Sequence, residues 1–383
     1  MPLFILAHAT HHLITALIQP MQGFIQDEFR LNKAQLGGMM TAFSLSSAFS
    51  QLPSGWFADR IGPTILISIG IIGVGIGGVL IGISTTYSML LVFFVFLGLM
   101  AGGYHPASTP LISLSVPPNQ RGRALGLHLI GGNSSFFLAP LIGGAIAAAW
   151  GWRSSYLVLA VPTIILGVFF FIYLKKRYGK AHVEAMKRRQ MAETPPQPGY
   201  KRRLTAFLVM MVLGGGAGAT INSFLTVFMK EELGASNETA GMAMSIVFSS
   251  GIWAGPIGGW ISDRIGSTRV IIVTGILGGL VLFALTHVQL GWGLWGVLWI
   301  MGVIQALRFP VTEVFIMSQS PAKNRSTIYG IYYSTMQYTG AIFAPIMGGF
   351  IDKYGYDTMF TFSAWAVTGV AVVTSLFIWD AKG

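Results

Sequence analysis

The sequence has no cysteine and few charged residues. It is 383 residues long, and only 10% of them are Asp, Glu, Lys or Arg, against about 25% in a typical soluble domain. The missing cysteines exclude disulfide bonds and thiolate metal sites. The shortage of charge leaves too little polar surface to cover a soluble protein of this length. The net charge of +11 does not predict nucleic-acid binding, because the basic residues lie in loops between apolar runs.

The sequence instead contains long apolar runs. They fall at residues 65–84, 89–101, 156–174, 204–213, 270–285 and 360–379. A helix that crosses a bilayer needs about 20 mostly apolar residues, so these runs predict a multi-pass, all-α protein embedded in lipid. Turn and charge signals place twelve membrane helices at residues 3–27, 35–57, 63–84, 87–115, 121–149, 153–175, 204–229, 239–261, 268–288, 290–317, 325–351 and 358–379.

One long polar stretch, residues 175–203, separates the sixth expected helix from the seventh. It is rich in Lys and Arg, and its TPPQPG segment cannot continue a helix. Basic residues also collect in alternate loops, at Arg60, Arg121, Arg123, Arg264, Arg269, Lys323 and Arg325. Because basic loops face the cytoplasm, we predict a six-helix bundle at 1–175, a cytoplasmic linker at 176–203 and a second bundle at 204–383. Both termini would then be cytoplasmic, in a protein of the inner membrane.

A sequence repeat relates the two predicted bundles. GWFADRIGPT at 55–64 recurs as GWISDRIGST at 259–268, which is 204 residues further along. The same offset places Arg121 on Arg325, Gly126 on Gly330 and Pro106 on Pro310. The sequence therefore predicts two pseudo-symmetric halves in parallel orientation.

The repeated motif resembles the signature of the major facilitator superfamily, Gly-x-x-x-Asp-Arg-x-Gly between the second and third helices. The matching residues are Gly55, Asp59, Arg60 and Gly62 in the first half, and Gly259, Asp263, Arg264 and Gly266 in the second. The first copy lacks the basic pair that usually follows, and the second keeps only Arg269. The resemblance implies a monomeric transporter that moves a small molecule by alternating access. It also implies neither enzyme activity nor a cofactor.

In that family the motif forms a cytoplasmic latch. An aspartate beside a helix N-terminus can accept hydrogen bonds there, and the adjacent arginine can hold a carboxylate or last-turn carbonyls. The expected partners are Arg121 or Arg123 for one aspartate and Arg325 for the other. The alternative is that Asp-Arg only marks a cytoplasmic loop.

A narrower resemblance links residues 102–144 to drug exporters of the fosmidomycin-resistance type. It rests on His105-Pro106, on RGRA, on GGN and on APLIGG at 139–144. His8 matches the histidine that opens that family's first helix, but His12 stands where an aspartate is expected. APLIGG resembles an antiporter signature, yet it recurs as APIMGG at 344–349, so a packing kink explains both copies equally well. The kink residues are Pro140, Gly143, Gly144, Pro345, Gly348 and Gly349.

Ionisable residues inside the expected helices are candidates for function. Glu313 is the one acidic residue in the interior of an expected span, since Asp27 stands at the external end of the first. We predict that Glu313 carries the coupled proton; the alternative is a structural partner for a histidine or for Arg308. Arg308 suits an anionic substrate. The repeat places Thr109 on Glu313, so His105 and Glu313 could face a shared cavity from opposite halves. Asn222 is a further candidate for substrate contact.

The first helix carries His8, His11 and His12 on one face. Ligand binding and hydrogen bonding between helices both remain open for them. No metal site is predicted, because that helix carries no carboxylate near the histidines. The sequence as a whole predicts proton-coupled export of a drug-like or anionic metabolite. An organic-anion importer, exchanger or uniporter is the alternative, and a membrane sensor is a third possibility.

Overall fold

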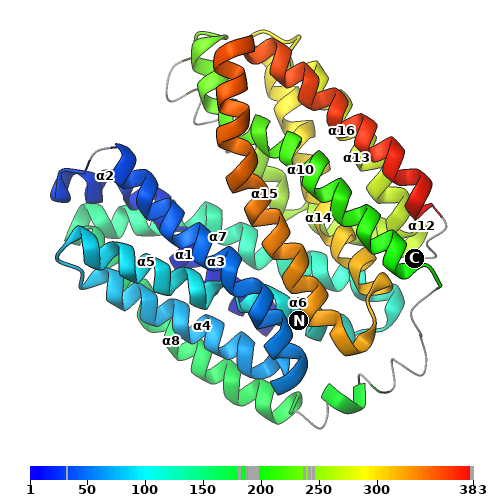
Figure 1. Cartoon of the computed structure of the whole chain (residues 1–383). Coiled ribbons are helices and arrows are strands. Elements are labelled where there is room, and N and C mark those ends of the chain that lie inside the picture. Colours follow the sequence, from blue (N-terminus) through cyan, green and yellow to red (C-terminus); the bar gives the residue numbers. More distant parts are fainter. Residues whose placement is uncertain are drawn as a thin grey trace. The chain divides into compact units, whose positions relative to one another are not determined.

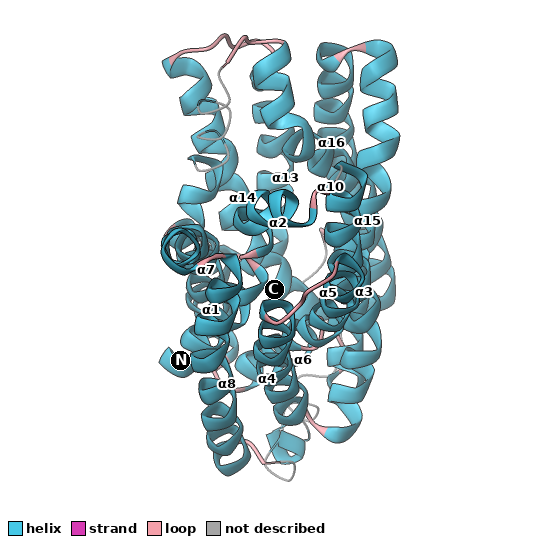
Figure 2. Ribbon diagram, turned by 90° about the vertical axis from the view of Figure 1, so that its left-hand side faces the viewer, coloured by secondary structure: helices cyan, strands magenta, loops and turns pink. Residues whose placement is uncertain are grey.

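The chain folds almost entirely into helices. The computed structural model describes residues 1–31, 33–179, 183–186, 188, 198–235, 239, 243 and 246–379. Figures 1 and 2 show helices joined by short loops, with no strand in these described ranges. The all-α prediction is confirmed.

Eight α-helices cover the first half of the sequence. They are α1 Pro2–Thr15, α2 Ile18–Phe29, α3 Lys33–Ile61, α4 Pro63–Gly82, α5 Tyr87–Ala101, α6 Tyr104–Leu114, α7 Arg121–Trp150 and α8 Trp152–Arg177, with the 3₁₀ turn η1 Pro118–Gln120 before α7. The second half contains α10 Tyr200–Glu231, η2 Ser250–Ile252, α12 Ala254–Ile265, α13 Ser267–Leu285, α14 Trp292–Gln319, η3 Ala322–Asn324, α15 Arg325–Tyr354 and α16 Tyr356–Ile378. Of the predicted linker 176–203, the structure describes residues 176–179, 183–186, 188 and 198–203. Helix α8 extends into it as far as Arg177, and α10 begins in it at Tyr200.

The helix boundaries repeat with the offset of 204 residues. α3 and α12, α4 and α13, and α7 and α15 have matching ends or starts, and so do α8 and α16. The turns repeat as well, because backbone φ is positive at Arg30 and Gly234, at Gly62 and Gly266, and at Gly151 and Gly355. A positive φ favours glycine, which explains why five of these six positions are glycine. Helix packing repeats too, since α4 packs on α8 as α13 packs on α16.

The chain divides into two compact units, which exchange equivalent segments. The first consists of residues 1–116, 127–195 and 321–334, and the second of residues 117–126, 196–320 and 335–383. Each unit therefore contains the start of a long helix, α15 or α7, whose remainder belongs to the other unit. Contacts are described below only within a unit.

Three of the predicted spans are interrupted in the structure. The first span breaks at Ala16 and Leu17, the fourth at Gly102 and Gly103, and the eighth at Trp253. A proline follows shortly after each break, at Pro20, Pro106 and Pro256. Proline has no N–H for the carbonyl four residues earlier, so each ring weakens the helix at or next to the observed break. The predicted spans are therefore not single regular helices at these three places, whereas α14 continues through Pro310.

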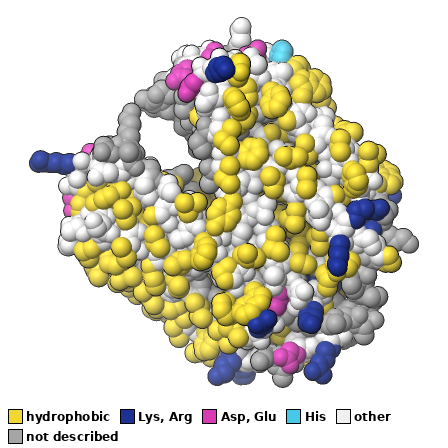
Figure 3. All heavy atoms as spheres, viewed as in Figure 1, with side chains coloured by type: hydrophobic (Ala, Val, Ile, Leu, Met, Phe, Trp, Pro, Cys, Tyr) yellow, Lys and Arg dark blue, Asp and Glu magenta, His cyan; other side chains and the backbone are white. Residues whose placement is uncertain are grey.

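The outward surface is apolar. Among the described residues, seven helical stretches are long and apolar enough to cross a membrane, and two of them join neighbouring elements (α5 with α6, η1 with α7): Pro63–Gly82, Tyr87–Leu114, Pro118–Trp150, Trp152–Arg177, Ser267–Leu285, Trp292–Gln319 and Tyr356–Ile378. Phe49, Phe137 and Ile165 each expose more than 60% of their surface. Hydrophobic side chains dominate the face drawn in Figure 3, and charged side chains are few on it. Such a surface suits contact with lipid tails.

A polar cluster joins three helices in the first unit. The Glu28 carboxylate accepts hydrogen bonds from Trp152 Nε1 at 2.8 Å and from Arg153 Nη1 at 2.6 Å. Arg153 also donates to the carbonyl oxygen of Ser84, just after α4. The second unit contains a related contact. Tyr356, which the repeat aligns with Trp152, donates a hydrogen bond from Oη to Glu231 at 3.1 Å.

Candidate gating and substrate sites

The first copy of the repeated motif caps the start of α15. Asp59 Oδ1 accepts a hydrogen bond from the backbone N–H of Ser326 at 3.1 Å. Its Oδ2 accepts from the backbone N–H of Thr327 at 2.8 Å and from the Thr327 hydroxyl at 2.9 Å. The carboxylate thus satisfies N–H groups that the first turn of a helix leaves without an internal partner. Arg325, the expected partner, is the residue directly before these donors.

The second copy repeats this geometry in the second unit. Asp263 accepts hydrogen bonds from the backbone N–H groups of Gly122 and Arg123, each at 3.0 Å. Burial raises the pKa of the Asp263 carboxyl above its ordinary value, and the two N–H groups oppose that shift. The expected arginine partner, Arg123, therefore takes part through its backbone. Arg121 lies in the same first turn of α7.

The arginines of the motif lie over aromatic rings. The Arg60 guanidinium stands 3.6 Å from the ring centre of Trp56, and that of Arg264 stands 3.9 Å from Trp260. These are cation–π contacts between residues one helical turn apart. We expected the arginines to hold a carboxylate or carbonyls, and the structure places them on tryptophan instead. The repeated Trp-x-x-x-Arg spacing was the signal for this contact.

The first glycine of each motif allows two helices to touch. A Cβ atom on Gly55 would collide with the carbonyl oxygen of Ser326, and one on Gly259 would collide with that of Gly122. The last glycines, Gly62 and Gly266, instead hold the positive φ of the turn, at 103° and 88°.

The glycine pairs of the APLIGG and APIMGG segments behave alike. A Cβ on Gly143 would collide with Leu17, and one on Gly348 would lie 2.9 Å from the ring of Phe224. At Gly144 and Gly349 a Cβ would meet nothing within 4 Å. The first glycine of each pair therefore has a packing role. The side chains of Pro140 and Pro345 lie outside the described part of the structure.

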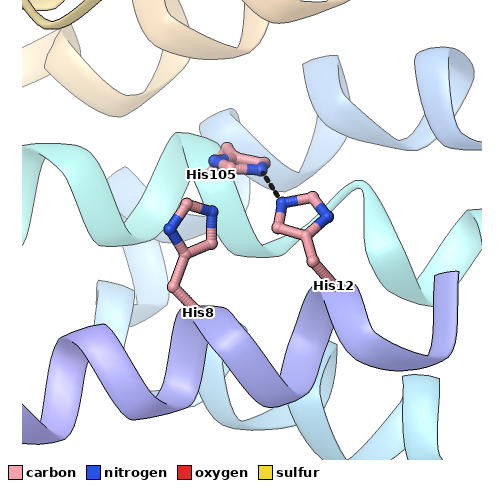
Figure 4. A group of neighbouring side chains, drawn as sticks. All are labelled: His8, His12 and His105. Atoms are coloured by element: carbon pink, nitrogen blue, oxygen red, sulfur yellow. Dashed lines mark hydrogen bonds between the residues drawn. The ribbon is translucent and has the colours of Figure 1, made fainter. Parts of the chain in front are cut away.

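A histidine cluster lies inside the first unit. His8 and His12 project from α1 and His105 from α6, and their rings converge in Figure 4. His12 Nε2 and His105 Nε2 are 3.1 Å apart, at hydrogen-bond distance. Tyr104 stacks on His11 with ring centres 4.6 Å apart. The sequence placed the helix-1 histidines on one face, and the structure adds His105 to them.

Tyr333 is a residue that the sequence analysis missed. Its ring centre is 5.1 Å from that of His105, and its hydroxyl lies 3.2 Å from Thr109 Oγ1. The repeat aligns Tyr333 with apolar Leu129, so the repeat gave no signal for it. His105 and Thr109 thus share one polar neighbour at the start of α15.

The remaining candidates lie on α14 and α10 in the second unit. Glu313 is buried, with 1% of its surface exposed. Arg308 Nη2 reaches Met210 Sδ on α10 at 3.6 Å. Asn222 Oδ1 accepts a long hydrogen bond of 3.5 Å from Gln305, a residue that the sequence analysis also missed. His105 and Glu313 belong to different units, so a cavity shared by them stays a prediction.

Comparisons with known proteins agree with this architecture. The family model described as Major Facilitator Superfamily matches residues 4–228 and 206–383. The multidrug resistance protein MdtG of Salmonella arizonae is 26% identical over 347 residues, which cover 88% of this chain and 84% of that protein. MdtG of Citrobacter koseri is likewise 26% identical, with 88% and 83% covered.

Two solved structures show the same fold. The human organic anion transporter MFSD10 superposes with a TM-score of 0.78 at 13% identity, covering 97% of this chain and 98% of that one. The fucose:proton symporter FucP of E. coli superposes with a TM-score of 0.72 at 13% identity, covering 100% and 99%. This fold implies twelve helices in two halves. The chain therefore belongs to the major facilitator superfamily, and it is a multi-pass membrane protein that carries out secondary active transport of small molecules and is not an enzyme.

Proposed function

We propose that this protein exports a drug-like or anionic small molecule from the cytoplasm in exchange for protons. It would act as a monomer in the inner membrane, with both termini in the cytoplasm and no nucleic-acid partner. Support comes from the relatives named multidrug resistance proteins and from the basic loops that the sequence places on one side.

The observation that carries proton coupling is the burial of Glu313. Its carboxyl lies within the apolar helix α14 with 1% of its surface exposed. A carboxyl group in such a place is costly to bury, so residues of this kind usually mark a functional site. It can hold a proton while it faces one side of the membrane and release it when water reaches it from the other side.

Arg308 favours an anionic substrate. It lies on the same helix as Glu313 and contacts Met210 of α10. Asn222, further along α10, contacts Gln305 of α14 and offers a separate amide. A guanidinium can bind a carboxylate or phosphate through two hydrogen bonds. The same residue also suits the second candidate function, import or exchange of an organic anion.

The capped helix starts would control the change of access. Asp59 and Asp263 bind backbone groups that must separate when a cytoplasmic pathway opens. Their hydrogen bonds would therefore stabilise the state that is closed to the cytoplasm. Weakening them shifts the populations of the two states and leaves substrate contacts intact.

Transport by purified protein in lipid vesicles tests the proposal. A panel of organic anions and lipophilic drugs is measured with and without a pH gradient. We expect that, in the wild type, a pH gradient drives the substrate in the direction opposite to the protons. Glu313→Gln should lose the pH-driven transport and retain exchange at equal pH.

The control is Glu232→Gln, which removes an exposed carboxylate of the same type. Unchanged pH-driven transport in Glu313→Gln would refute the proton role. A Glu313→Gln protein that does not fold would instead favour the structural alternative. Vesicles in which the gradient drives only uptake of organic anions would favour import over export.

A further inference from the structure

We propose that His8, His12 and His105 form a binding site for a divalent transition-metal ion. One nitrogen from each ring lies within 4.8 Å of the nitrogens of the other two. The three come from two helices, α1 and α6, of the same compact unit. The site is independent of the proposed proton role of Glu313.

The spacing is close to that of a tetrahedral metal site. Zinc–imidazole bonds of about 2.0–2.1 Å place neighbouring ligand nitrogens roughly 3.3 Å apart in a tetrahedron. His12 Nε2 and His105 Nε2 already lie 3.1 Å apart. The third nitrogen has to move by no more than about 1.5 Å, which a change in side-chain rotation can supply.

In two of the rings, His8 and His12, the nitrogen that would not bind the metal (Nδ1) has a hydrogen-bond partner, as is usual for metal-binding histidines. His8 Nδ1 lies 2.9 Å from the carbonyl oxygen of His128, to which it can only donate. This fixes the proton on Nδ1 and leaves a lone pair on Nε2. That Nε2 atom is buried and has no hydrogen-bond partner among the residues that the structure describes.

The second ring has a similar arrangement. His12 Nδ1 lies 3.3 Å from Thr15 Oγ1, and this hydroxyl donates its own proton to the carbonyl oxygen of His12. The hydroxyl oxygen can therefore accept a hydrogen bond from His12 Nδ1–H, which leaves the lone pair on Nε2, on the side of His105. Without a metal, the two rings share a hydrogen bond there; an ion would replace it.

Gly132 on α7 leaves room for the cluster. A Cβ atom at this position would lie 2.8 Å from His8 Nε2 and 3.1 Å from His12 Cδ2. Any side chain there would press on the ring atoms that face the proposed ion. The site thus depends on a glycine as well as on the histidines.

The ligand set defines the class of metal. Neutral imidazoles favour Zn²⁺, Co²⁺, Ni²⁺ or Cu²⁺ over Mg²⁺ and Ca²⁺, which prefer oxygen. Three protein ligands leave the fourth position open. Because the three ligands carry no negative charge, an anionic oxygen from water or from a small molecule would best complete the site. His12, which replaces the aspartate expected from drug exporters, is thus one of the ligands.

Direct titration tests the site. The full-length protein is purified in detergent through a tag without histidines and titrated with Co²⁺, followed by visible absorption. We expect the intense bands of tetrahedral Co²⁺, saturating at one ion per chain and lost when Zn²⁺ is added. A wild-type protein that gives no such bands and retains no Zn²⁺ would overturn the proposal, whatever the variants do.

Variants identify the ligands. His12→Asn and His105→Asn should each weaken Zn²⁺ binding at least a hundredfold, and Gly132→Ala should also weaken it. His287→Asn, an exposed histidine on another helix end, serves as the control and should bind as the wild type does. Equal Zn²⁺ binding by folded His12→Asn and His105→Asn proteins would show that the ion binds elsewhere and would refute the assignment.

Discussion

Asp59 and Thr327 are joined by two hydrogen bonds to one carboxylate oxygen, from the backbone N–H at 2.8 Å and from the hydroxyl at 2.9 Å. The two residues lie far apart in the sequence, at the end of α3 and the start of α15. A movement that separates the end of α3 from the start of α15 must therefore break both hydrogen bonds together. The contact also explains why the motif places an aspartate just before a turn.

Asp59→Asn should lower the transport rate about fivefold or more, because a charge-assisted cap contributes roughly 1–3 kcal/mol. The amide keeps one acceptor oxygen, but its NH₂ group would face the N–H of Thr327. Substrate binding to the purified protein should stay within about twofold of the wild type. Vesicle transport and equilibrium binding measure the two effects. Asp27→Asn, an exposed aspartate, is the control; normal transport by Asp59→Asn would limit the motif to marking topology.

Gly55→Ala should be more harmful than alanine at an open glycine. The new methyl group would collide with the carbonyl oxygen of Ser326, a backbone atom that cannot rotate away. We expect a transport loss of about tenfold, and a similar loss for Gly259→Ala, since misplaced helices alter access. Gly369→Ala, whose Cβ would meet nothing within 4 Å, should transport normally. Equal activity of all three variants would contradict the packing role.

The stability contributed by Glu28 should depend on pH. The hydrogen bond from Arg153 lowers the pKa of the Glu28 carboxyl below the ordinary glutamate value of 4.5. This stability is present above the ordinary value and is lost as the pH falls through the lowered one. Because both side chains are partly exposed, it amounts to about 1 kcal/mol or less.

Thermal unfolding in detergent measures the contribution of Glu28. Wild type should unfold about 1 °C above Glu28→Gln at neutral pH, and the difference should disappear in strongly acidic buffer. The neighbouring Asp27→Asn variant should show no such pH-dependent difference. A difference that persists unchanged at low pH would assign the stability to packing and not to the charge.

The absence of cysteine makes the topology easy to test. A single cysteine introduced as Gln190→Cys or Thr85→Cys is the one thiol in the chain. In intact cells an impermeant thiol reagent should label Thr85→Cys and leave Gln190→Cys unlabelled until the membrane is opened. The position of residue 190 lies outside the described structure. Labelling of Gln190→Cys in intact cells would reverse the predicted orientation.

Much of the fold was accessible from the sequence because the chain repeats itself. The offset of 204 residues between the GWFADRIGPT and GWISDRIGST segments predicted which turns and helix ends would correspond. Prolines predicted the helix breaks only in part, since a break precedes Pro20 and Pro106 whereas α14 continues through Pro310. Whether a proline breaks a helix depends on neighbouring helices that can satisfy the freed carbonyl.

The sites were harder to predict, because they combine residues from distant segments. The helical spacing of His8 and His12 was visible, but the approach of His105 depends on how α6 packs after the break at Gly102. The cap of Asp59 was predictable in kind from the helix N-terminus, and the contact of Trp56 with Arg60 from their spacing, whereas the repeat aligns Tyr333 with Leu129 and gave no sign of its position. The spacing between residues on one helix can be read from sequence, and the spacing between helices depends on side-chain packing.

The exchange of residues 117–126 and 321–334 between the compact units has a consequence for biosynthesis. A ribosome that has made the first 180 residues has produced every helix of the first half. The nascent protein still lacks Ser326 and Thr327, the donors that bind the Asp59 carboxylate. The first unit is therefore completed only after most of the second half has been synthesised and inserted. The first half therefore cannot mature before the second, whereas the second unit's borrowed segment, residues 117–126, has already been synthesised when the second half emerges.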